Sequence, residues 1–321
     1  GVDMAGACDR ATLQIAKSPH HQIARRRLCV HNGPMSHTSQ FAYLNGQFVP
    51  RREAKIDVED HGLLFADGVY EVTRFYAGRP LGMDAHLNRM RRSLAAVGIV
   101  EPDDFPRFAE LSDELLSRNG MTDAADYWQV SRGLAPRTRR TPTGIRPTVV
   151  MLAYPAAPLD PAAEPAPTTA ITTPDLRWLR CDIKSLMLLP TIMAQQQADA
   201  ADVNTAILHR DGVVTEATSA NILIVRDGAL VTHPADQWIL GGIGRRVVLA
   251  LARADSIEVR EEAFTVDAMR AADEVLICGT TTHVGPVTRI DGQTIGDGGA
   301  GPIGRRLRRA FVEYVSEQCL R

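Results

Sequence analysis

A chain of 321 residues with a formal net charge of −2 can form one large or two ordinary domains, and it has no charge excess that would favour nucleic acid or an anionic membrane. Its composition, 45% hydrophobic and 23% charged, is that of a globular protein. The five cysteines are scattered and form no CxxC pair, which argues against a disulfide framework and a metal site and favours a reducing, cytoplasmic compartment.

Residues 1–40 show no clear hydrophobic period and begin with Gly1 rather than methionine. Their basic, polar segment 18–37 lacks the apolar core of a secretory signal. We expect a disordered extension or translated upstream sequence with a natural start near Met35, the alternative being a weak organelle presequence. No run in the chain reaches the roughly 20 apolar residues of a membrane helix, so no membrane span is expected.

Ordered structure is expected from residue 41, with a small α/β domain over 41–154. Asn45-Gly46 between two short apolar runs predicts a type I′ hairpin. GVYEVTRFY predicts a strand, and apolar residues at helical spacing predict a helix that begins at Asp84. A second helix from about residue 105, which ends near Gly120, and the strands DYWQVSRG and PTVVMLAYP follow.

Six prolines over residues 155–174 predict an extended linker, because proline fixes φ and lacks a backbone donor. A larger domain is expected over 175–321. It contains predicted helices at about 186–199, at 242–255 and from Pro302, and predicted strands in NTAILHRDG, VVTEATSANILIVRDG, EVLICGTTT and VTRIDGQTIG. This order favours an α/β or α+β fold with antiparallel hairpins over a doubly wound sheet.

Two charged residues stand in unusually apolar surroundings. Lys184 precedes an apolar run, where a charged ammonium is costly to bury but a neutral amine can form a Schiff base. Glu216 lies in a strand of small and apolar residues, where a carboxylate needs a partner. Each has an ordinary alternative, namely a solvated surface lysine and a structural hydrogen bond, and a functional one, in which Glu216 faces a protonated ring nitrogen.

Three further features suit a phosphate group. The glycine-rich turn at 241–244 opens a helix whose first N–H groups are free, the GTTT segment at 279–282 has three hydroxyls, and Arg89 lies on the first predicted helix. Each is common alone, and a glycine turn before a helix is most often a simple connection. Together with Lys184 and Glu216 they compose a pyridoxal-phosphate site, in which a protonated pyridine stabilises a carbanion and the lysine moves the α-proton.

Six segments resemble, in order and spacing, the fold-type IV pyridoxal-phosphate enzymes and, within them, the D-amino-acid aminotransferases: DHGLLFADGVYEV, MDAHLNRM, RWLRCDIKSL, AILHRDGVVTEATSAN, THPADQWILGGIGRRVV and GTTTHVGPVTRIDG. The resemblance covers the chain from about Phe41 to its end. It implies a two-domain fold-type IV enzyme with pyridoxal 5′-phosphate as cofactor and no metal. It identifies Lys184 as the Schiff-base lysine and Glu216 as the partner of the pyridine nitrogen.

The same resemblance implies roles for the rest of the cofactor site. Arg177 would order the surroundings of Lys184 and Glu216. The phosphate would be held by Arg89, by the N–H groups of Ile243 and Gly244, and by Thr280 and Thr281, while Ser219 and Leu240 would line the cofactor. Gly244 departs from a frequent threonine and Met187 from a frequent asparagine, and neither change removes a catalytic group.

The substrate site is implied by a smaller set. Tyr70, Arg137 and Arg139 resemble a trap for the substrate carboxylate, in which the two arginines reach the site of a partner subunit, and Tyr127 matches an aromatic residue that lines the site. Arg139 replaces the usual histidine but keeps a positive charge and hydrogen-bond donors. Without the resemblance, this basic loop would be interpreted as a solvated turn.

The resemblance therefore implies a homodimeric transaminase that moves the amino group of a D-amino acid, of the D-alanine or D-glutamate type, to a 2-oxo acid by a ping-pong mechanism. Branched-chain aminotransferases, (R)-amine transaminases and aminodeoxychorismate lyase have the same fold and remain alternatives. Two arginines and a tyrosine for a carboxylate argue against a plain amine pocket. A non-catalytic cofactor-binding protein is the alternative from another class, and the presence of Lys184 and Glu216 argues against it.

Overall fold

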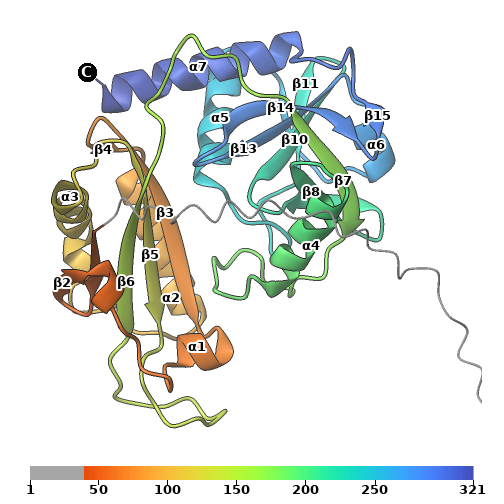
Figure 1. Cartoon of the computed structure of the whole chain (residues 1–321). Helices are drawn as coiled ribbons and strands as arrows, with labels where there is room; N and C mark the ends of the chain where they lie inside the picture. Colours follow the sequence, from red (N-terminus) through yellow and green to blue (C-terminus); the bar gives the residue numbers. More distant parts are fainter. Residues whose placement is uncertain (1–39, 321) are drawn as a thin grey trace, which may run out of the picture. The chain divides into compact units, whose positions relative to one another are not determined.

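The computed structural model describes residues 40–320 (Figure 1), so the predictions for residues 1–39 lie outside the described residues. The chain forms two sheets in succession, one of six strands and one of nine, and its helices lie between the strands and after the last of them. The expected mixed α and β fold is confirmed. The division into domains on either side of the proline-rich linker stays a prediction.

The first sheet is wholly antiparallel, in the order β2-β1-β6-β5-β3-β4. Its hairpin turn has Asn45 at φ 46° and Gly46 at φ 92°, as a type I′ turn requires, so that prediction is confirmed. The elements are β1 (Phe41–Leu44), β2 (Gln47–Pro50), η1 (Arg51–Glu53), α1 (His61–Phe65), β3 (Gly68–Tyr76), β4 (Arg79–Pro80), α2 (Met83–Ala96), η2 (Phe105–Arg107), α3 (Phe108–Arg118), β5 (Ala124–Ser131) and β6 (Thr148–Pro155).

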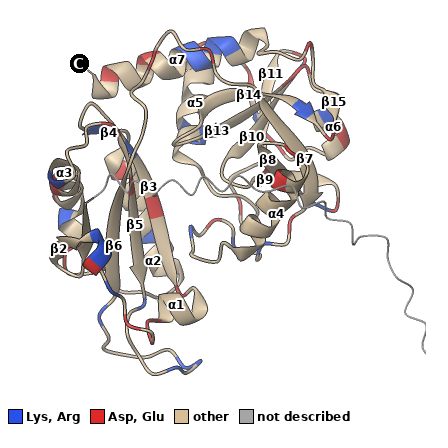
Figure 2. Ribbon diagram, in the orientation of Figure 1, with Lys and Arg blue, Asp and Glu red and all other residues tan. Residues whose placement is uncertain are grey.

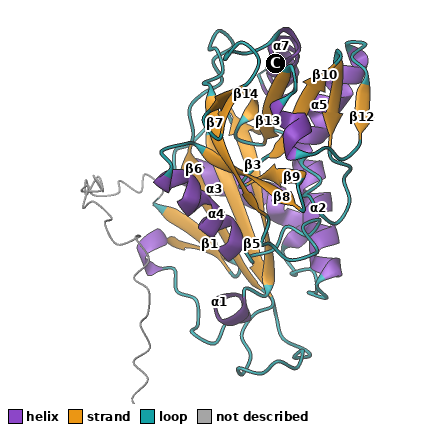
Figure 3. Cartoon of the chain, turned by 90° about the vertical axis from the view of Figure 1, so that its right-hand side faces the viewer, coloured by secondary structure: helices purple, strands orange, loops and turns teal. Residues whose placement is uncertain are grey.

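Helices α2 and α3 pack against this sheet (Figure 3). Alternate residues of β3 and β5 meet apolar residues of the two helices in one core, which includes Phe75, Met90, Leu115 and Trp128. Since neighbouring residues of a strand point to opposite faces, Tyr70 and Val72 face away from this core. One strand thus contributes to a packed interior on one face and to a cavity on the other.

The second sheet is mixed, in the order β12-β11-β10-β13-β14-β7-β8-β9, with β15 paired to β14. Strand β7 runs parallel to both of its neighbours, and β11 is parallel to β12. The elements are β7 (Thr168–Pro174), α4 (Leu189–Ala200), β8 (Thr205–Arg210), β9 (Val213–Ala217), β10 (Asn221–Arg226), β11 (Ala229–Thr232), α5 (Ile243–Ala254), β12 (Val259–Glu261), α6 (Val266–Arg270), β13 (Glu274–Gly279), β14 (His283–Ile290), β15 (Gln293–Thr294) and α7 (Pro302–Cys319).

Several boundaries differ from the sequence predictions. Helix α2 begins at Met83 with Gly82 as its N-cap residue, so Asp84, the expected N-cap, lies in the first turn instead. Residues 168–174, which we assigned to the linker, form β7, because only their last residue is a proline and the threonines before it suit a strand. Residues 213–228 form two strands rather than one. Helix α4 begins at Leu189 rather than near residue 186, because Ser185 and Leu186 pair with the start of β3 instead.

Helix α7 begins at a buried carboxylate. Glu274 accepts hydrogen bonds from the backbone N–H groups of Ile303 at 2.8 Å and Gly304 at 2.7 Å, which satisfies two of the open donors at the helix start. The arginines at 305–309 appear as blue bands along α7 in Figure 2, and three of the four are exposed, as expected for a solvated face. Within residues 40–320, no helix is long and apolar enough to span a membrane.

A buried carboxyl group in the first sheet is the most unusual feature of its core. Asp126 on β5 accepts a hydrogen bond from Trp128 Nε1 at 2.5 Å, while its Oδ1 has no hydrogen-bond partner in the part of the chain that the structure describes. Burial raises the pKa of Asp126 to about 7 from 3.8, because a charged carboxylate is poorly solvated there. The folded protein therefore holds this proton more tightly than the unfolded chain does.

The substitution Asp126→Asn should remove a pH dependence of stability. Because its pKa is raised in the folded state, Asp126 contributes fully to the free energy of unfolding below about pH 4. This contribution is lost as the pH rises through about 7. The free energy of unfolding of the unmodified protein, relative to Asp126→Asn, should fall by several kcal/mol across this window in urea titrations. The exposed Asp103→Asn serves as control, and a difference between the Asp126→Asn and unmodified proteins that stays constant with pH contradicts the prediction.

Candidate active site

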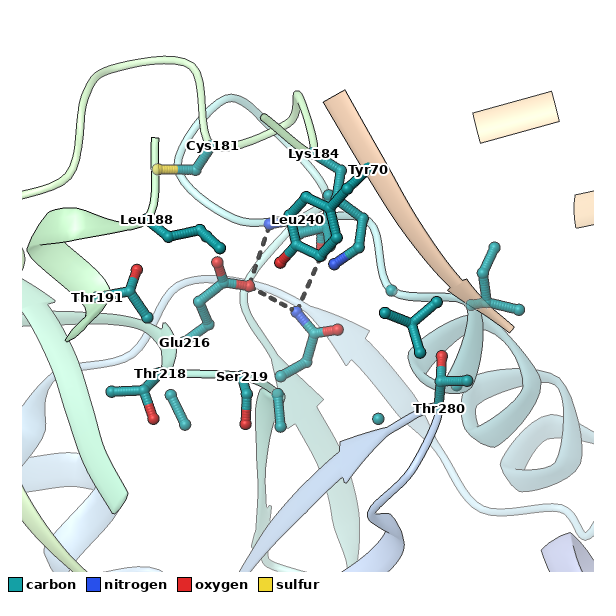
Figure 4. Close-up of a pocket in the computed structure, with 18 of the residues that line it drawn as sticks. Tyr70, Cys181, Lys184, Leu188, Thr191, Glu216, Thr218, Ser219, Leu240 and Thr280 are labelled. Atoms are coloured by element: carbon teal, nitrogen blue, oxygen red, sulfur yellow. Dashed lines mark hydrogen bonds between the residues drawn. The ribbon is translucent and has the colours of Figure 1, made fainter. Parts of the chain in front are cut away.

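A cavity of about 250 Å³ contains most of the predicted site residues (Figure 4). Its walls come from β3, α2, the segment between β7 and α4, the turn between β9 and β10, the turn before α5 and the end of β13. Polar residues of the predicted site that line it are Tyr70, Arg89, Arg177, Lys184, Glu216, Ser219, Thr280 and Thr281. Leu240, Ile243 and Gly244 also line it and complete the predicted cofactor-binding residues.

Lys184 is held in the cavity wall by its backbone. Its carbonyl accepts a hydrogen bond from Tyr70 N at 3.0 Å, and two residues on Leu186 N donates to Gly68 O at 3.0 Å, so this segment pairs with the start of β3. The side chain is half-buried, and Nζ lies 4.1 Å from the centroid of the Tyr70 ring. Within residues 40–320 its ammonium has no carboxylate partner, which leaves the amine available to a ligand.

Glu216 lies near the end of β9 with its carboxylate fixed by three donors. Oε2 accepts from Asn221 Nδ2 and from Leu240 N, both at 3.1 Å, and Oε1 accepts from Arg177 NH1. Figure 4 shows the bond from Leu240 to Glu216 as a dashed line. Burial raises the pKa of Glu216, and the positive charge of Arg177 opposes this rise.

Arg177 is in turn held by Asp175, which follows β7. Arg177 donates to the Asp175 carboxylate from Nε at 2.9 Å and from NH2 at 2.7 Å. This bidentate contact fixes the plane of the guanidinium. Asp175 also accepts from the Thr215 hydroxyl at 3.0 Å and from Arg210 Nε at 3.2 Å. Burial would raise the pKa of Asp175, but hydrogen bonds and charge from Arg177 lower it.

Asp175, Asn221 and Thr215 are parts of this network that the sequence analysis missed. Asp175 stands two residues before Arg177, and Asn221 follows the TSA turn after Glu216. The close spacing of an acid and an arginine after a threonine-rich strand was the available signal for Asp175. Nothing in the sequence indicated that Asn221 bridges Glu216 and the carbonyl of Leu240.

The start of α5 presents open backbone donors to the cavity. Gly242 is the N-cap residue, and no side chain caps the helix. A Cβ on Gly244 would lie 3.0 Å from the carbonyl carbon of Gly279, so glycine allows the helix start to approach the end of β13. Thr280 and Thr281 follow that strand end and also line the cavity. N–H groups, hydroxyls and the helix dipole together suit an anion.

Arg89 reaches the cavity from α2. It donates to the Glu71 carboxylate from Nε at 2.7 Å and NH2 at 2.8 Å, and from NH1 to the Gly241 carbonyl at 3.2 Å. Three of the five N–H bonds of its guanidinium are thus used, which leaves two for a ligand. The predicted phosphate-binding groups Arg89, Ile243, Gly244, Thr280 and Thr281 therefore meet at one end of the cavity.

The predicted substrate residues are less closely grouped. Tyr70 lines the cavity, whereas Tyr127 does not: its ring lies 5.6 Å from the Tyr70 ring, and its hydroxyl donates to Gln129 at 2.7 Å. Arg137 lies 5.6 Å above the Phe65 ring, outside the cavity. Arg139 lines a second cavity of about 320 Å³ that shares Trp178, Ser185 and Met187 with the first.

Comparison with known proteins gives consistent matches over most of the chain. The family model for class IV aminotransferases matches residues 68–290. A D-alanine aminotransferase of Staphylococcus epidermidis is 39% identical over 280 residues, which cover 87% of this chain and 99% of that protein. A D-alanine aminotransferase of Bacillus licheniformis is 41% identical over 271 residues, covering 84% and 95%.

Solved structures agree with this match. A T.th. branched-chain amino acid aminotransferase with pyridoxamine 5′-phosphate has a TM-score of 0.80 to this chain at 28% identity. The similarity covers 87% of this chain and 95% of that chain.

Replacing Arg177 by glutamine should strongly destabilise the fold around the cavity. The change leaves Glu216 and Asp175 buried without the cation that both contact, and loss of one member of such a buried network costs about 3–5 kcal/mol. Chemical denaturation of Arg177→Gln measures the loss. Arg180→Gln is the matched control, because Arg180 pairs with Asp182 at an exposed position and its loss should leave stability unchanged. Equal effects of the two substitutions would contradict the prediction.

Proposed function

This chain belongs to the class IV aminotransferases, and on that premise we propose that it moves the amino group of a D-amino acid to a 2-oxo acid with pyridoxal 5′-phosphate as cofactor. D-Alanine is the donor that the names of the relatives support, and 2-oxoglutarate is the acceptor we expect. The observation that carries the proposal is a single cavity with an unpaired lysine amine, a buried carboxylate and an open helix start.

The cavity lining fits this cofactor. The backbone donors of Ile243 and Gly244, the hydroxyls of Thr280 and Thr281, and the two remaining N–H bonds of Arg89 match the acceptor oxygens of a phosphate group. Glu216 supplies the buried carboxylate that a protonated ring nitrogen needs. When bound, the cofactor supplies an electron sink for the carbanion that the substrate forms on loss of its α-proton.

We assign the covalent attachment and the proton transfer to Lys184. Among residues 40–320 it is the one lysine that lines the cavity, and a neutral amine released by the incoming substrate is a competent base for the α-proton. The face of Tyr70 limits where Nζ can move, since the ring lies 4.1 Å away and its strand is hydrogen-bonded to the Lys184 carbonyl.

Glu216 acts through its charge and its fixed position. Three donors orient the carboxylate, so it meets a ring N–H without reorganisation. Burial raises the pKa of Glu216, and the charge and hydrogen bond of Arg177 oppose this rise and favour the carboxylate form. Asp175 keeps Arg177 in place. Ser219 and Leu240 form the remaining cofactor wall in this proposal.

We infer that the substrate carboxylate is bound by Tyr70 together with Arg137 and Arg139 of a second copy of the chain, in a homodimer. Within one chain, neither arginine lines the cavity with Lys184, so each is free to serve another site. Apolar side chains are exposed beside the cavity, which favours a covered surface there: Leu176, Leu179, Met187, Leu189, Ile192 and Met193. Tyr127 supports Tyr70 from the neighbouring strand.

Two further points complete the proposal. A branched-chain L-amino-acid transaminase is the second candidate, because the solved structure compared above is named a branched-chain aminotransferase.

We also propose a cytoplasmic location, since the cysteines among residues 40–320 are free thiols: Cys181, Cys278 and Cys319.

The visible spectrum of the cofactor-loaded protein tests the reaction and its substrate. D-Alanine should bleach the yellow colour at least about tenfold faster than L-leucine or (R)-1-phenylethylamine, because only the D-amino acid presents its carboxylate to the arginines in reactive orientation. Lys184→Ala is the control and should not bleach with any donor. Faster bleaching by L-leucine or by the amine would make that compound, rather than a D-amino acid, the substrate. Absence of cofactor colour would refute the proposal.

Mixing two inactive variants tests the shared site. Lys184→Ala and Arg137→Ala should each be inactive or nearly so as homodimers. If Arg137 serves the partner's site, a mixed dimer has one intact site. An equal mixture that exchanges subunits should then recover about a quarter of the activity of the unmodified protein. A trap within one chain predicts no recovery, as does a monomer.

A further inference from the structure

A buried cluster of three charged or polar side chains lies beside the phosphate-binding end of the cavity. Glu71 lies on β3, and His86 and Arg89 lie on one face of α2, three residues apart. Glu71 Oε1 accepts from Arg89 Nε at 2.7 Å, and Oε2 accepts from Arg89 NH2 and His86 Nδ1, both at 2.8 Å. Glu71 and His86 have no exposed surface.

The protonation of the cluster follows from its contacts. Burial alone would raise the pKa of Glu71, but the charge and hydrogen bonds of Arg89, with His86, lower it to about 2, so Glu71 is a carboxylate. Burial lowers the pKa of His86, which is therefore a neutral ring that donates from Nδ1. Its Nε2 then faces inward as an acceptor without a partner among residues 40–320.

Only one member of the cluster reaches the cavity. Arg89 lines it, whereas Glu71 and His86 do not, because Glu71 points to the face of β3 opposite Tyr70. Any effect of Glu71 or His86 on a ligand must therefore pass through Arg89. The third bond of Arg89, to the Gly241 carbonyl at 3.2 Å, connects the same guanidinium to the turn that precedes α5.

We propose that Glu71 and His86 are positioning residues that fix Arg89 so that its two remaining N–H bonds meet the phosphate group of the cofactor, a role that rests on the proposed function. A free arginine side chain has many rotamers. The bidentate hydrogen bonding to Glu71 removes that freedom before the ligand binds. His86 holds the carboxylate without adding a charge. The ion pair with Glu71 also partly neutralises the charge of Arg89. The guanidinium therefore binds phosphate through the orientation of its N–H bonds as much as through its charge.

The affinities of the full-length apoprotein for pyridoxal 5′-phosphate and for pyridoxal test the proposal. Both ligands can react with Lys184, but only the first has a phosphate. Glu71→Gln should weaken binding of pyridoxal 5′-phosphate by about 10- to 100-fold, the range for a lost hydrogen bond to a charged group. It should change binding of pyridoxal less than about twofold. A merely structural role would weaken both ligands alike, and that result would overturn the proposal.

Three further variants make the test specific. In the Arg89→Gln background, Glu71→Gln should cause no additional loss, because its effect passes through Arg89, and additive losses contradict the proposal. His86→Phe, which cannot donate to Glu71, should reduce phosphate-dependent affinity about threefold to tenfold and decides the question if Glu71→Gln does not fold. Glu274→Gln, a buried carboxylate at the start of α7, is the matched control and should lose stability but not affinity.

The same titrations separate this proposal from the proposed function. An unmodified protein that binds neither pyridoxal nor its phosphate ester would refute both. An unmodified protein that binds the phosphate ester more tightly, together with a Glu71→Gln variant that keeps this preference, would leave the function intact and refute the role of Glu71 and His86.

Discussion

The ion pair between Arg177 and Glu216 is the interaction on which the cavity depends. It joins the segment after β7 to the end of β9, two parts of the chain that are 39 residues apart. Two buried opposite charges hold each other only when every further donor and acceptor is satisfied, and here Asp175, Asn221 and the N–H of Leu240 complete the set. The pair is therefore both a structural requirement and the means of presenting one carboxylate in a fixed orientation.

The turn at residues 240–244 is where the charged networks meet. Leu240 N donates to Glu216, the Gly241 carbonyl accepts from Arg89, and Gly242 leaves room for the Asn221 amide, which a Cβ there would strike. The next residues open α5 with free N–H groups. A shift of this turn would disturb the carboxylate end and the phosphate end of the cavity together, so cofactor binding reports on both.

The sequence predicted the residues that face the cavity better than those that hold them. Lys184 and Glu216 were recognisable because charged residues are unusual in apolar surroundings. The glycine turn was recognisable only together with them and with the resemblance. Asp175, Glu71 and His86 were not, since a buried acid looks like any other acid until its partner is known, and Glu71 and Arg89 are 18 residues apart. The start of α4 was misplaced for a similar reason, because Ser185 pairs with Val69 far back in the chain.

The loop that carries Arg137 and Arg139 is fixed at its base and exposed at its tip. Gly133 has φ 106°, and a Cβ there would strike the Arg146 carbonyl, so the two ends of the loop must lie close together. Asp60 accepts from the hydroxyls of Ser131 and Thr148, at 2.7 and 2.6 Å, and thereby ties the two strands at that base.

If Arg137 and Arg139 bind the substrate carboxylate as proposed, this anchoring would separate substrate choice from cofactor chemistry. The networks around Glu216 and Arg89 are buried, and a change in either alters stability as well as binding. A histidine could replace Arg139 at the loop tip without changing those networks, because Arg139 forms no hydrogen bond with their members. Under the proposed assignment, a change of substrate could arise in the loop without a change in Lys184, Glu216 or Arg89.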